Sequence, residues 1–215
     1  TLWNVYAFFV TYARLDGFDP TAPSIPVEER PDLDRWALSR LQGVVETFTE
    51  ALDTYLVYRG VQAAQAFIED LSNWYVRRGR RRYWKSSVDA DKQAAYQTLY
   101  ELLTTLVRLL APVMPFWTEA MYQNLVRRAD PQAVPSVHLS DWPVPDPEQR
   151  DPELEQSMGV VQRVVRVGRA ARNGADVKIR QPLRSALIRV NDDREWAAVM
   201  SLDQHIRDEL NVKAI

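Results

Sequence analysis

Apolar residues recur at every third or fourth position along the first two-thirds of this chain, the spacing of one face of an α-helix. Leu99, Leu102, Leu103 and Leu106 show it most clearly. The 215 residues include only 7 glycines, and proline or glycine lies where the pattern stops. We therefore predict helices over residues 1–15, 32–55, 58–84, 91–111, 115–127 and 152–173, with Asp32 as the N-cap of the second.

The pattern changes near the end of the chain. Residues 183–190 favour a short β-strand, 195–210 a helix, and 211–215 the start of another strand. The predicted fold class is mainly α, an antiparallel helix bundle with a small C-terminal α+β appendix. The predicted domains are a helical bundle over 1–150, a linking basic helix over 151–177 and a truncated α+β junction over 178–215. Because the chain stops within the last pattern, we expect a fragment of a longer protein.

Composition excludes several classes of function. There is no cysteine, which excludes a disulfide framework and a thiolate zinc site. The only histidines, His138 and His205, are far apart, so we expect no metal site in these residues. No apolar run is long enough to span a membrane. No glycine-rich phosphate loop, nucleophile elbow or carboxylate pair indicates catalytic residues. We expect a cytoplasmic protein that binds no membrane.

Charge is concentrated in two places although the net charge is only −2. Residues 77–85, which we call the basic segment, carry six basic side chains and no acidic one. Residues 159–189, the C-terminal basic segment, carry eight basic side chains and one acidic one. The remaining residues are therefore acidic overall. Such separation favours a polyanionic partner.

The basic segment continues an apolar helical stripe. An uninterrupted α-helix would carry three of these cations, Arg78, Arg82 and Lys85, on the same face as the apolar residues. Trp74 lies one turn before Arg78 on that face, and Leu71 lies two turns before it. Like charges four residues apart repel one another, and either phosphates or the chain's own carboxylates would relieve that repulsion. Both interpretations stay open on this pattern alone. The neighbouring aromatic residues are typical of the core and also of surfaces that stack on unpaired bases.

The run LSNWYVRRGRRRYW at residues 71–84 closely resembles the anticodon-binding region of isoleucyl-tRNA synthetases, which are class I enzymes. Further stretches agree with this family in the same order along nearly the whole chain. They are LWNVYAFFVTYA (2–13), DRWALSRL (34–41), LLAPVMPFWTEAMYQNL (109–125), SVHLSDWP (136–143), VGRAARN (167–173), VKIRQPL (177–183) and DELNVK (208–213).

The resemblance implies a helix bundle of the class I synthetase anticodon-binding type, belonging to an isoleucine–tRNA ligase. Such an enzyme uses ATP and magnesium, contains zinc in some relatives, and edits misloaded valine in a separate domain. Its His-Ile-Gly-His and Lys-Met-Ser-Lys-Ser signatures are absent here. We therefore expect a non-catalytic, monomeric module without a cofactor of its own, covalently linked to catalytic and editing domains, that positions isoleucine tRNA.

Both lines of reasoning assign tRNA binding to the basic segment and a secondary tRNA contact to the C-terminal one. Six phosphate contacts would lower the affinity about a thousandfold between 50 and 200 mM salt. Trp84 or Tyr83 is the candidate for stacking on a base. Two alternatives remain: a structural module whose arginines pair internally, and the equivalent domain of a valine- or leucine-specific enzyme. The predicted tRNA-binding residues are Arg77, Arg78, Arg80, Arg81, Arg82, Trp84 and Lys85, with Arg163, Arg166, Arg169 and Arg172 as the secondary set.

Overall fold

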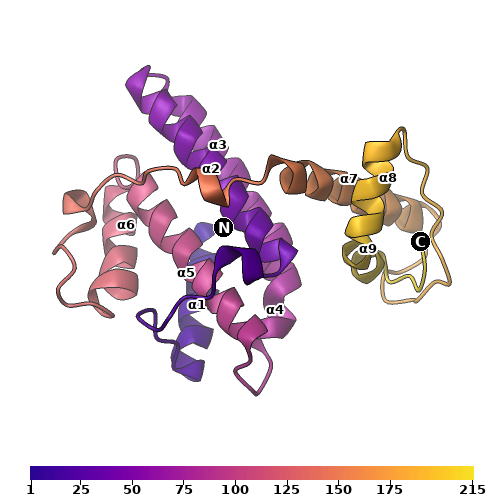
Figure 1. Ribbon diagram of the computed structural model, residues 1–215, viewed down its shortest axis with the longest axis horizontal. Coiled ribbons are helices and arrows are strands. Elements are labelled where there is room, and N and C mark those ends of the chain that lie inside the picture. Colours follow the sequence, from indigo (N-terminus) through magenta and orange to yellow (C-terminus); the bar gives the residue numbers. More distant parts are fainter. The chain divides into compact units, whose positions relative to one another are not determined.

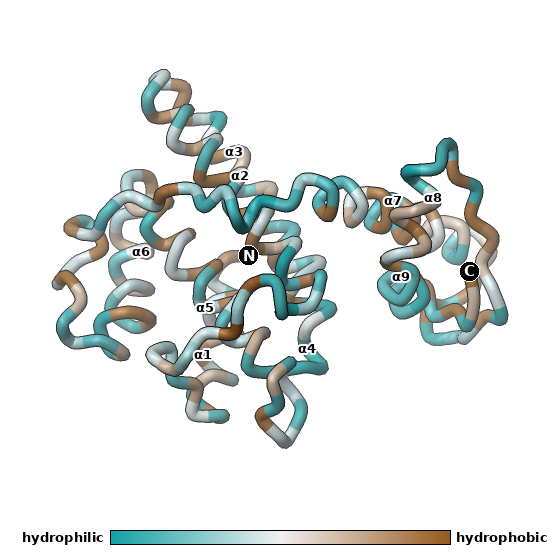
Figure 2. The backbone as a smooth tube through the Cα atoms, viewed as in Figure 1, coloured by the Kyte–Doolittle hydropathy of each residue, from teal (hydrophilic) through white to brown (hydrophobic).

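The computed structural model describes all residues from Thr1 to Ile215, in two compact units, Thr1–Arg150 and Asp151–Ile215. Both units are built from helices without a regular β-strand, so the predicted mainly α fold class is confirmed. Hydrophobic and hydrophilic residues alternate along the helices (Figure 2), as helices with one buried face require. None of the helices combines the length and the apolar character that crossing a membrane requires.

The first unit is a helical bundle (Figure 1). Its helix α5 contacts α1, α2, α4 and α6. Leu99, Leu102, Leu103 and Leu106 of α5 are completely buried, so this helix forms the centre of the core. The helices of the unit are α1 (Leu2–Asp16), α2 (Asp32–Asp53), α3 (Val57–Asp70), α4 (Arg77–Tyr83), α5 (Ala90–Leu110) and α6 (Pro115–Tyr122).

Helix ends follow local chemistry. α1 ends at Gly17, whose φ of 65° is a left-handed conformation that glycine adopts without steric cost, and whose N–H donates to the carbonyl of Ala13. The prediction that Asp32 caps α2 is wrong by one residue. Pro31 occupies the cap position, and Asp32 is the first helical residue. There its negative charge favours the positive end of the helix dipole.

Helices α2 and α3 form a long hairpin whose backbones come close together (Figure 1). At Gly60 of α3, an added Cβ would lie 2.9 Å from Cγ and 3.1 Å from Cα of Phe48 in α2. The contact with Cγ is shorter than real Cβ atoms show and the contact with Cα is unusually tight, so a larger residue would force the Phe48 ring or the two helices to move. Phe48 is completely buried as a result of this close approach.

The predicted helix over 58–84 is continuous but not uniformly α-helical. Leu71–Val76 forms a π-helix between α3 and α4. A π-turn accommodates one extra residue, so the inward face of α4 moves by one sequence position. Gly79 and Tyr83 are buried there, where an uninterrupted α-helix would have turned Arg78 and Arg82 inward. A second π-helix, Gln123–Arg127, extends α6.

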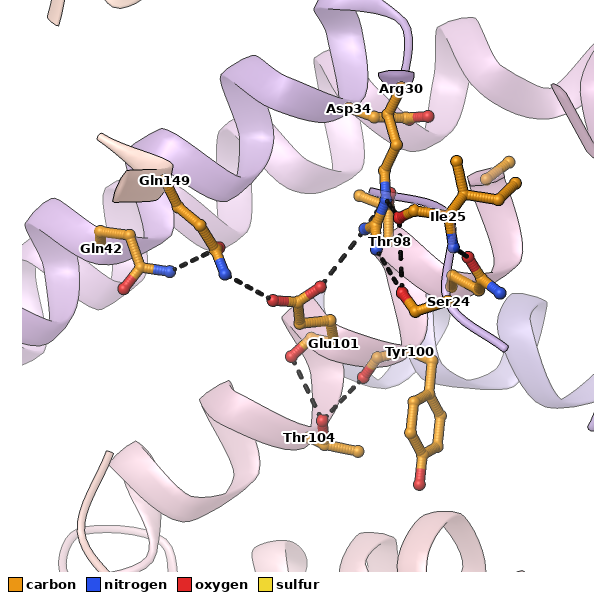
Figure 3. Close-up of polar contacts among 12 residues, drawn as sticks. Ser24, Ile25, Arg30, Asp34, Gln42, Thr98, Tyr100, Glu101, Thr104 and Gln149 are labelled. Carbon is orange, nitrogen blue, oxygen red and sulfur yellow. Dashed lines mark hydrogen bonds and ion pairs between the residues drawn. The ribbon is translucent and has the colours of Figure 1, made fainter. Parts of the chain in front are cut away.

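A buried arginine fastens the proline-rich connection between α1 and α2 to the core (Figure 3). Arg30 is only 5% exposed. Its guanidinium donates to the carbonyl of Ile25 and to the hydroxyls of Ser24 and Thr98, each at 3.0 Å. It also pairs with Glu101 of α5 at 3.3 Å. Each of its three nitrogens therefore has at least one acceptor, which makes it tolerable to bury this arginine.

The same network holds the end of the first unit (Figure 3). Gln149 donates to Glu101 at 3.2 Å and accepts from Gln42 of α2 at 2.9 Å. The backbone N–H of Asp146 in turn donates to Gln42 at 3.0 Å. The long loop after α6, which contains the 3₁₀ turns Val137–Leu139 and Pro147–Gln149, is therefore fixed across α2 and α5 at its far end.

The second unit consists of α7 (Pro152–Gly174), α8 (Asp193–Ser201) and α9 (Asp203–Leu210) with the segment 175–192 between them. The Asp151 side chain caps α7 by accepting from Leu154. The predicted strands are not formed as strands. Leu183 and Val212 make one isolated parallel bridge, supported by a 3.1 Å bond from the N–H of Lys213 to Leu183. The predicted α+β appendix is therefore helical, with a single bridge where strands were expected.

Candidate nucleic-acid interface

The basic segment lies on α4 and the turn that follows it, between the π-helix and α5. Its anchor is Asp34 of α2, a carboxylate with no exposed surface. Asp34 accepts 2.7 Å hydrogen bonds from the hydroxyl of Tyr75 and from both terminal nitrogens of Arg82. Arg82 also pairs with Asp91 at 2.8 Å. The buried charge of Asp34 is therefore compensated by a bidentate contact from the Arg82 guanidinium.

This cluster shifts the pKa of its members. Burial, reinforced by the negative charge of Asp34, holds the pKa of Tyr75 well above its ordinary value. Burial alone would lower the pKa of Arg82, but its hydrogen bonds to Asp34 raise it instead. Tyr75 therefore stays a neutral donor and Arg82 a permanent cation. The guanidinium of Arg82 is committed to the fold of the bundle.

Lys85, at the end of the basic segment, is paired as well. Its ammonium group lies 2.8 Å from Asp89 and 2.8 Å from Asp91. Hydrogen bonds to these two carboxylates raise the pKa of Lys85. The Asp89 carboxylate also accepts from the N–H of Lys92 and so caps α5. Lys85 is more than a third exposed, so this pairing is open to competition from solvent and from other anions.

A second buried cation lies behind this pair. Lys92 has no exposed side-chain surface and pairs with Asp16 of α1 at 2.7 Å while donating to the carbonyl of Lys85 at 2.7 Å. The Tyr96 hydroxyl also donates to Asp16. Burial acts to raise the pKa of Asp16, but the hydrogen bonds from Lys92 and Tyr96 outweigh it and hold that pKa below its ordinary value.

The Asp16 pair makes stability depend on pH. Because the pKa of Asp16 is lower in the folded state than in the unfolded chain, its stabilisation is complete above about pH 5 and is lost as the pH falls through the folded-state pKa. We expect Asp16→Asn to lower the free energy of unfolding by about 1–3 kcal/mol at pH 7 and by much less near pH 2. Urea unfolding across this range measures the difference. Asp53→Asn, at an exposed position, is the control, and a deficit that does not shrink with pH would contradict the assignment.

Arg80 and Arg81 are different from Arg82. Both are exposed on α4, and neither has an ion pair or side-chain hydrogen bond. Trp84 follows them, 57% exposed, with its indole N–H donating to the hydroxyl of Tyr12 on α1 at 2.8 Å. This places two unpaired guanidinium groups and one fixed, exposed aromatic ring on the same short stretch of chain. Such a combination suits phosphates with unstacked bases.

The other aromatic candidate, Tyr83, belongs to the core. It is 2% exposed and packs edge-to-face against Phe8 of α1 and Tyr96 of α5, at 5.0 Å between ring centroids in each case. Its hydroxyl donates to the carbonyl of Ala95. Of the two side chains considered for stacking, only Trp84 is accessible.

Arg77 and Arg78 are half-buried and engaged with their own helix. The Nε of Arg77 donates to the carbonyl of Asn73 at 2.7 Å. Arg78 lies over the ring of Trp74, 4.9 Å from its centroid, a cation–π contact. The six cations of the basic segment therefore fall into three groups. Arg82 and Lys85 pair with carboxylates of the bundle, Arg77 and Arg78 contact their own helix, and Arg80 and Arg81 are exposed without such contacts. Sequence reasoning treated these six cations alike because the π-helix and the distant carboxylate of Asp34 leave no local signal.

The C-terminal basic segment is mostly used within its own unit. Arg163 pairs with Glu195 of α8, and Arg169 pairs with Glu209 of α9. Arg172 is 7% exposed and donates to the carbonyls of Lys178 and Gln181. Of the four predicted secondary residues, Arg166 alone is exposed without such a contact.

Comparison with known proteins places this geometry in context. The family described as the anticodon-binding domain of tRNA ligases matches residues 34–187. The chain is 48% identical over 214 residues to an isoleucine–tRNA ligase of Dehalococcoides mccartyi and 47% identical over 216 residues to that of Thermus thermophilus. It is 40% identical over 215 residues to the isoleucine–tRNA ligase of Pyrococcus furiosus. Each match covers all of this chain but only 20–21% of the relative.

Proposed function

This chain belongs to the family of anticodon-binding domains of tRNA ligases, and we propose from this that it binds the anticodon stem-loop of an isoleucine tRNA. The observation that carries the proposal is the pair of exposed, unpaired guanidinium groups of Arg80 and Arg81 beside the exposed ring of Trp84. The arginines neutralise phosphates, and Trp84 offers a face for an unstacked base. Arg77 and Arg78 extend this contact along α4, and Arg166 offers a secondary contact on α7.

We further propose that the whole protein is a monomeric, cytoplasmic isoleucine–tRNA ligase. The isoleucine–tRNA ligase relatives, at 40–48% identity, support this substrate over valine or leucine. Binding of ATP and magnesium, catalysis and editing belong to parts of the protein outside these residues, because neither nucleotide-binding signature occurs here. No three metal-ligating side chains come together in the structure, so no step of the proposal runs through a metal in this chain.

The rival interpretation, a structural module with internally paired arginines, describes Arg82 and Lys85 well. It does not describe Arg80 and Arg81, whose charges repel those of their neighbours and gain nothing from the bundle. The positive charge that remains on α4 therefore favours an anionic partner. The paired cations hold the helix that presents the exposed ones.

The deciding experiment measures binding of this chain to the isoleucine tRNA stem-loop at about 50 and 200 mM salt, with a valine tRNA stem-loop alongside. Two phosphate contacts predict a fall of roughly tenfold, whereas six predict more than a thousandfold. We expect at least the tenfold fall, with preference for the isoleucine stem-loop. A thousandfold fall would mean that Arg82 and Lys85 also contact phosphates, giving up their ion pairs with carboxylates of this chain. Weak, salt-independent binding would overturn the proposal.

A further inference from the structure

A pocket opens on the other side of α1 from the basic segment. It lies within the first unit, between the C-terminal half of α1 and the π-helix Gln123–Arg127, and has a volume of about 390 Å³. Pockets of this size take one small ligand or one nucleotide unit. π-helical turns are rare and occur disproportionately at functional sites. We call this cavity the α1 pocket.

The inner wall of the α1 pocket is aromatic. Phe9, Phe18 and Tyr100 line it, with ring centroids 5.9 Å apart for Phe9 and Phe18 and 6.0 Å apart for Phe18 and Tyr100. Phe9 is only 3% exposed, so the accessible rings are those of Phe18 and Tyr100. Phe18 is itself stacked on Tyr96 at 5.3 Å, which fixes its ring. Leu125 completes the apolar surface.

The rim of the α1 pocket is cationic. Arg14 of α1 and Arg128, just after the π-helix, both line it, are exposed, and have no ion pair or hydrogen bond from their side chains. The one acidic residue at the rim, Asp19, is engaged by the N–H and the hydroxyl of Thr21 at 2.8 and 2.7 Å. Two unpaired guanidinium groups above an aromatic wall match an anionic group attached to a flat ring.

We propose that the α1 pocket takes one unpaired nucleotide of an RNA strand, with its base against Phe18 and Tyr100 and its phosphate between Arg14 and Arg128. The choice of RNA as the ligand rests on the proposed function. The inference adds a second site and assigns it the unpaired part of the RNA. Bases inside a duplex cannot enter a pocket of this kind, because their faces are already stacked.

The position of the α1 pocket supports a strand over a free nucleotide. Tyr12, which holds Trp84 by the hydrogen bond described above, lies on α1 only two residues before Arg14. Phe8 of the same helix packs against Tyr83 of α4. Helix α1 therefore contacts the end of α4 through Phe8 and Tyr12 and lines the α1 pocket through Phe9, Ala13 and Arg14. A strand whose phosphates meet Arg80 and Arg81 can cross α1 and leave one base in the pocket.

The test compares two RNAs with the same number of phosphates, a hairpin with a seven-nucleotide loop and a fully paired duplex. We expect this chain to prefer the hairpin by about 5- to 100-fold, the equivalent of one base stacked on aromatic side chains. The double variant Arg14→Gln, Arg128→Gln and the single variant Phe18→Leu should each lose most of the part of this preference that the α1 pocket supplies, whereas the part that stacking on Trp84 supplies should remain. The double variant Arg59→Gln, Arg194→Gln removes the same charge from exposed positions outside both basic segments and should keep the whole preference.

The outcomes separate the two proposals. If hairpin and duplex bind equally and salt-dependently, and the pocket variants change neither, the α1 pocket inference is overturned while tRNA binding stands. If neither RNA binds, the proposed function fails. Micromolar binding of a nucleoside monophosphate that does not compete with the hairpin would assign the pocket to a free nucleotide and overturn the RNA assignment. A 2-aminopurine base in the loop, whose fluorescence drops on stacking in the wild type alone, would support it.

Discussion

Replacing Asp34 by alanine is expected to lower the free energy of unfolding by about 3–5 kcal/mol, the usual cost of removing one partner of a buried ion pair. The Arg82 side chain, only 13% exposed, would lose the carboxylate that receives both of its terminal nitrogens. The hydroxyl of Tyr75 would lose its acceptor at the same time. Urea unfolding of the two proteins, followed by circular dichroism, measures the effect.

Asp32→Ala provides the matched control two residues away. Asp32 is about half exposed and pairs with Arg35 at 3.5 Å, and surface pairs of this kind contribute at most about 1 kcal/mol. The double variant Asp34→Leu, Arg82→Met should recover much of the stability, because an apolar pair does not leave a buried charge without a partner. A loss below about 1 kcal/mol for Asp34→Ala would show that Arg82 does not depend on this carboxylate.

Removing the charges of Arg80 and Arg81 is expected to weaken tRNA binding strongly without weakening the fold. In the double variant Arg80→Gln, Arg81→Gln, two phosphate contacts are lost, so the slope of log affinity against log salt should fall by about 2. Near 0.1 M salt this corresponds to a roughly fifty- to hundredfold lower affinity. Stability should be unchanged or slightly higher, because repulsion between Arg77 and Arg81 is relieved.

Arg82→Gln, which removes one charge from the same helix, should behave in the opposite way. It removes the partner of Asp34 and should destabilise the bundle, while a folded sample at low temperature keeps the salt slope of the wild type. Binding titrations at several salt concentrations, each paired with a urea unfolding curve, separate the two effects. If the double variant Arg80→Gln, Arg81→Gln and the wild type show the same slope of log affinity against log salt, neither arginine belongs to the interface.

Much of the fold follows from the sequence because helix formation is local. The leucine spacing of α5, the stop at Gly17 and the proline at the first position of α6 each depend on residues a few positions apart, and each was predicted correctly. The C-terminal strands were not. Residues 183–190 have strand-forming composition, but only Leu183 finds a partner, at Val212, and an isolated bridge is too short to form a strand.

The candidate site was less predictable, because residues far away in the sequence determine which of its cations are paired and which are exposed. Arg82 and Arg81 are adjacent in the sequence, yet one meets Asp34, 48 residues earlier in the chain, and the other faces solvent. The α1 pocket brings together Arg14 and Arg128, which no spacing rule connects. Periodicity indicates which face of a helix is buried, but pairing across a bundle is settled only by packing.

The π-helix before α4 has a consequence for changes in chain length. Because this wider turn already accommodates one extra residue, a deletion of one residue within Leu71–Val76 could be absorbed by reverting to ordinary α-helix, leaving α4 in place. A deletion of one residue between Val76 and Arg82 would rotate everything beyond it by about 100° and bring Tyr83 into the position of Arg82 beside Asp34. Related chains that differ in length by one residue here can therefore present the same arginines, and alignments should place the gap within the π-helix.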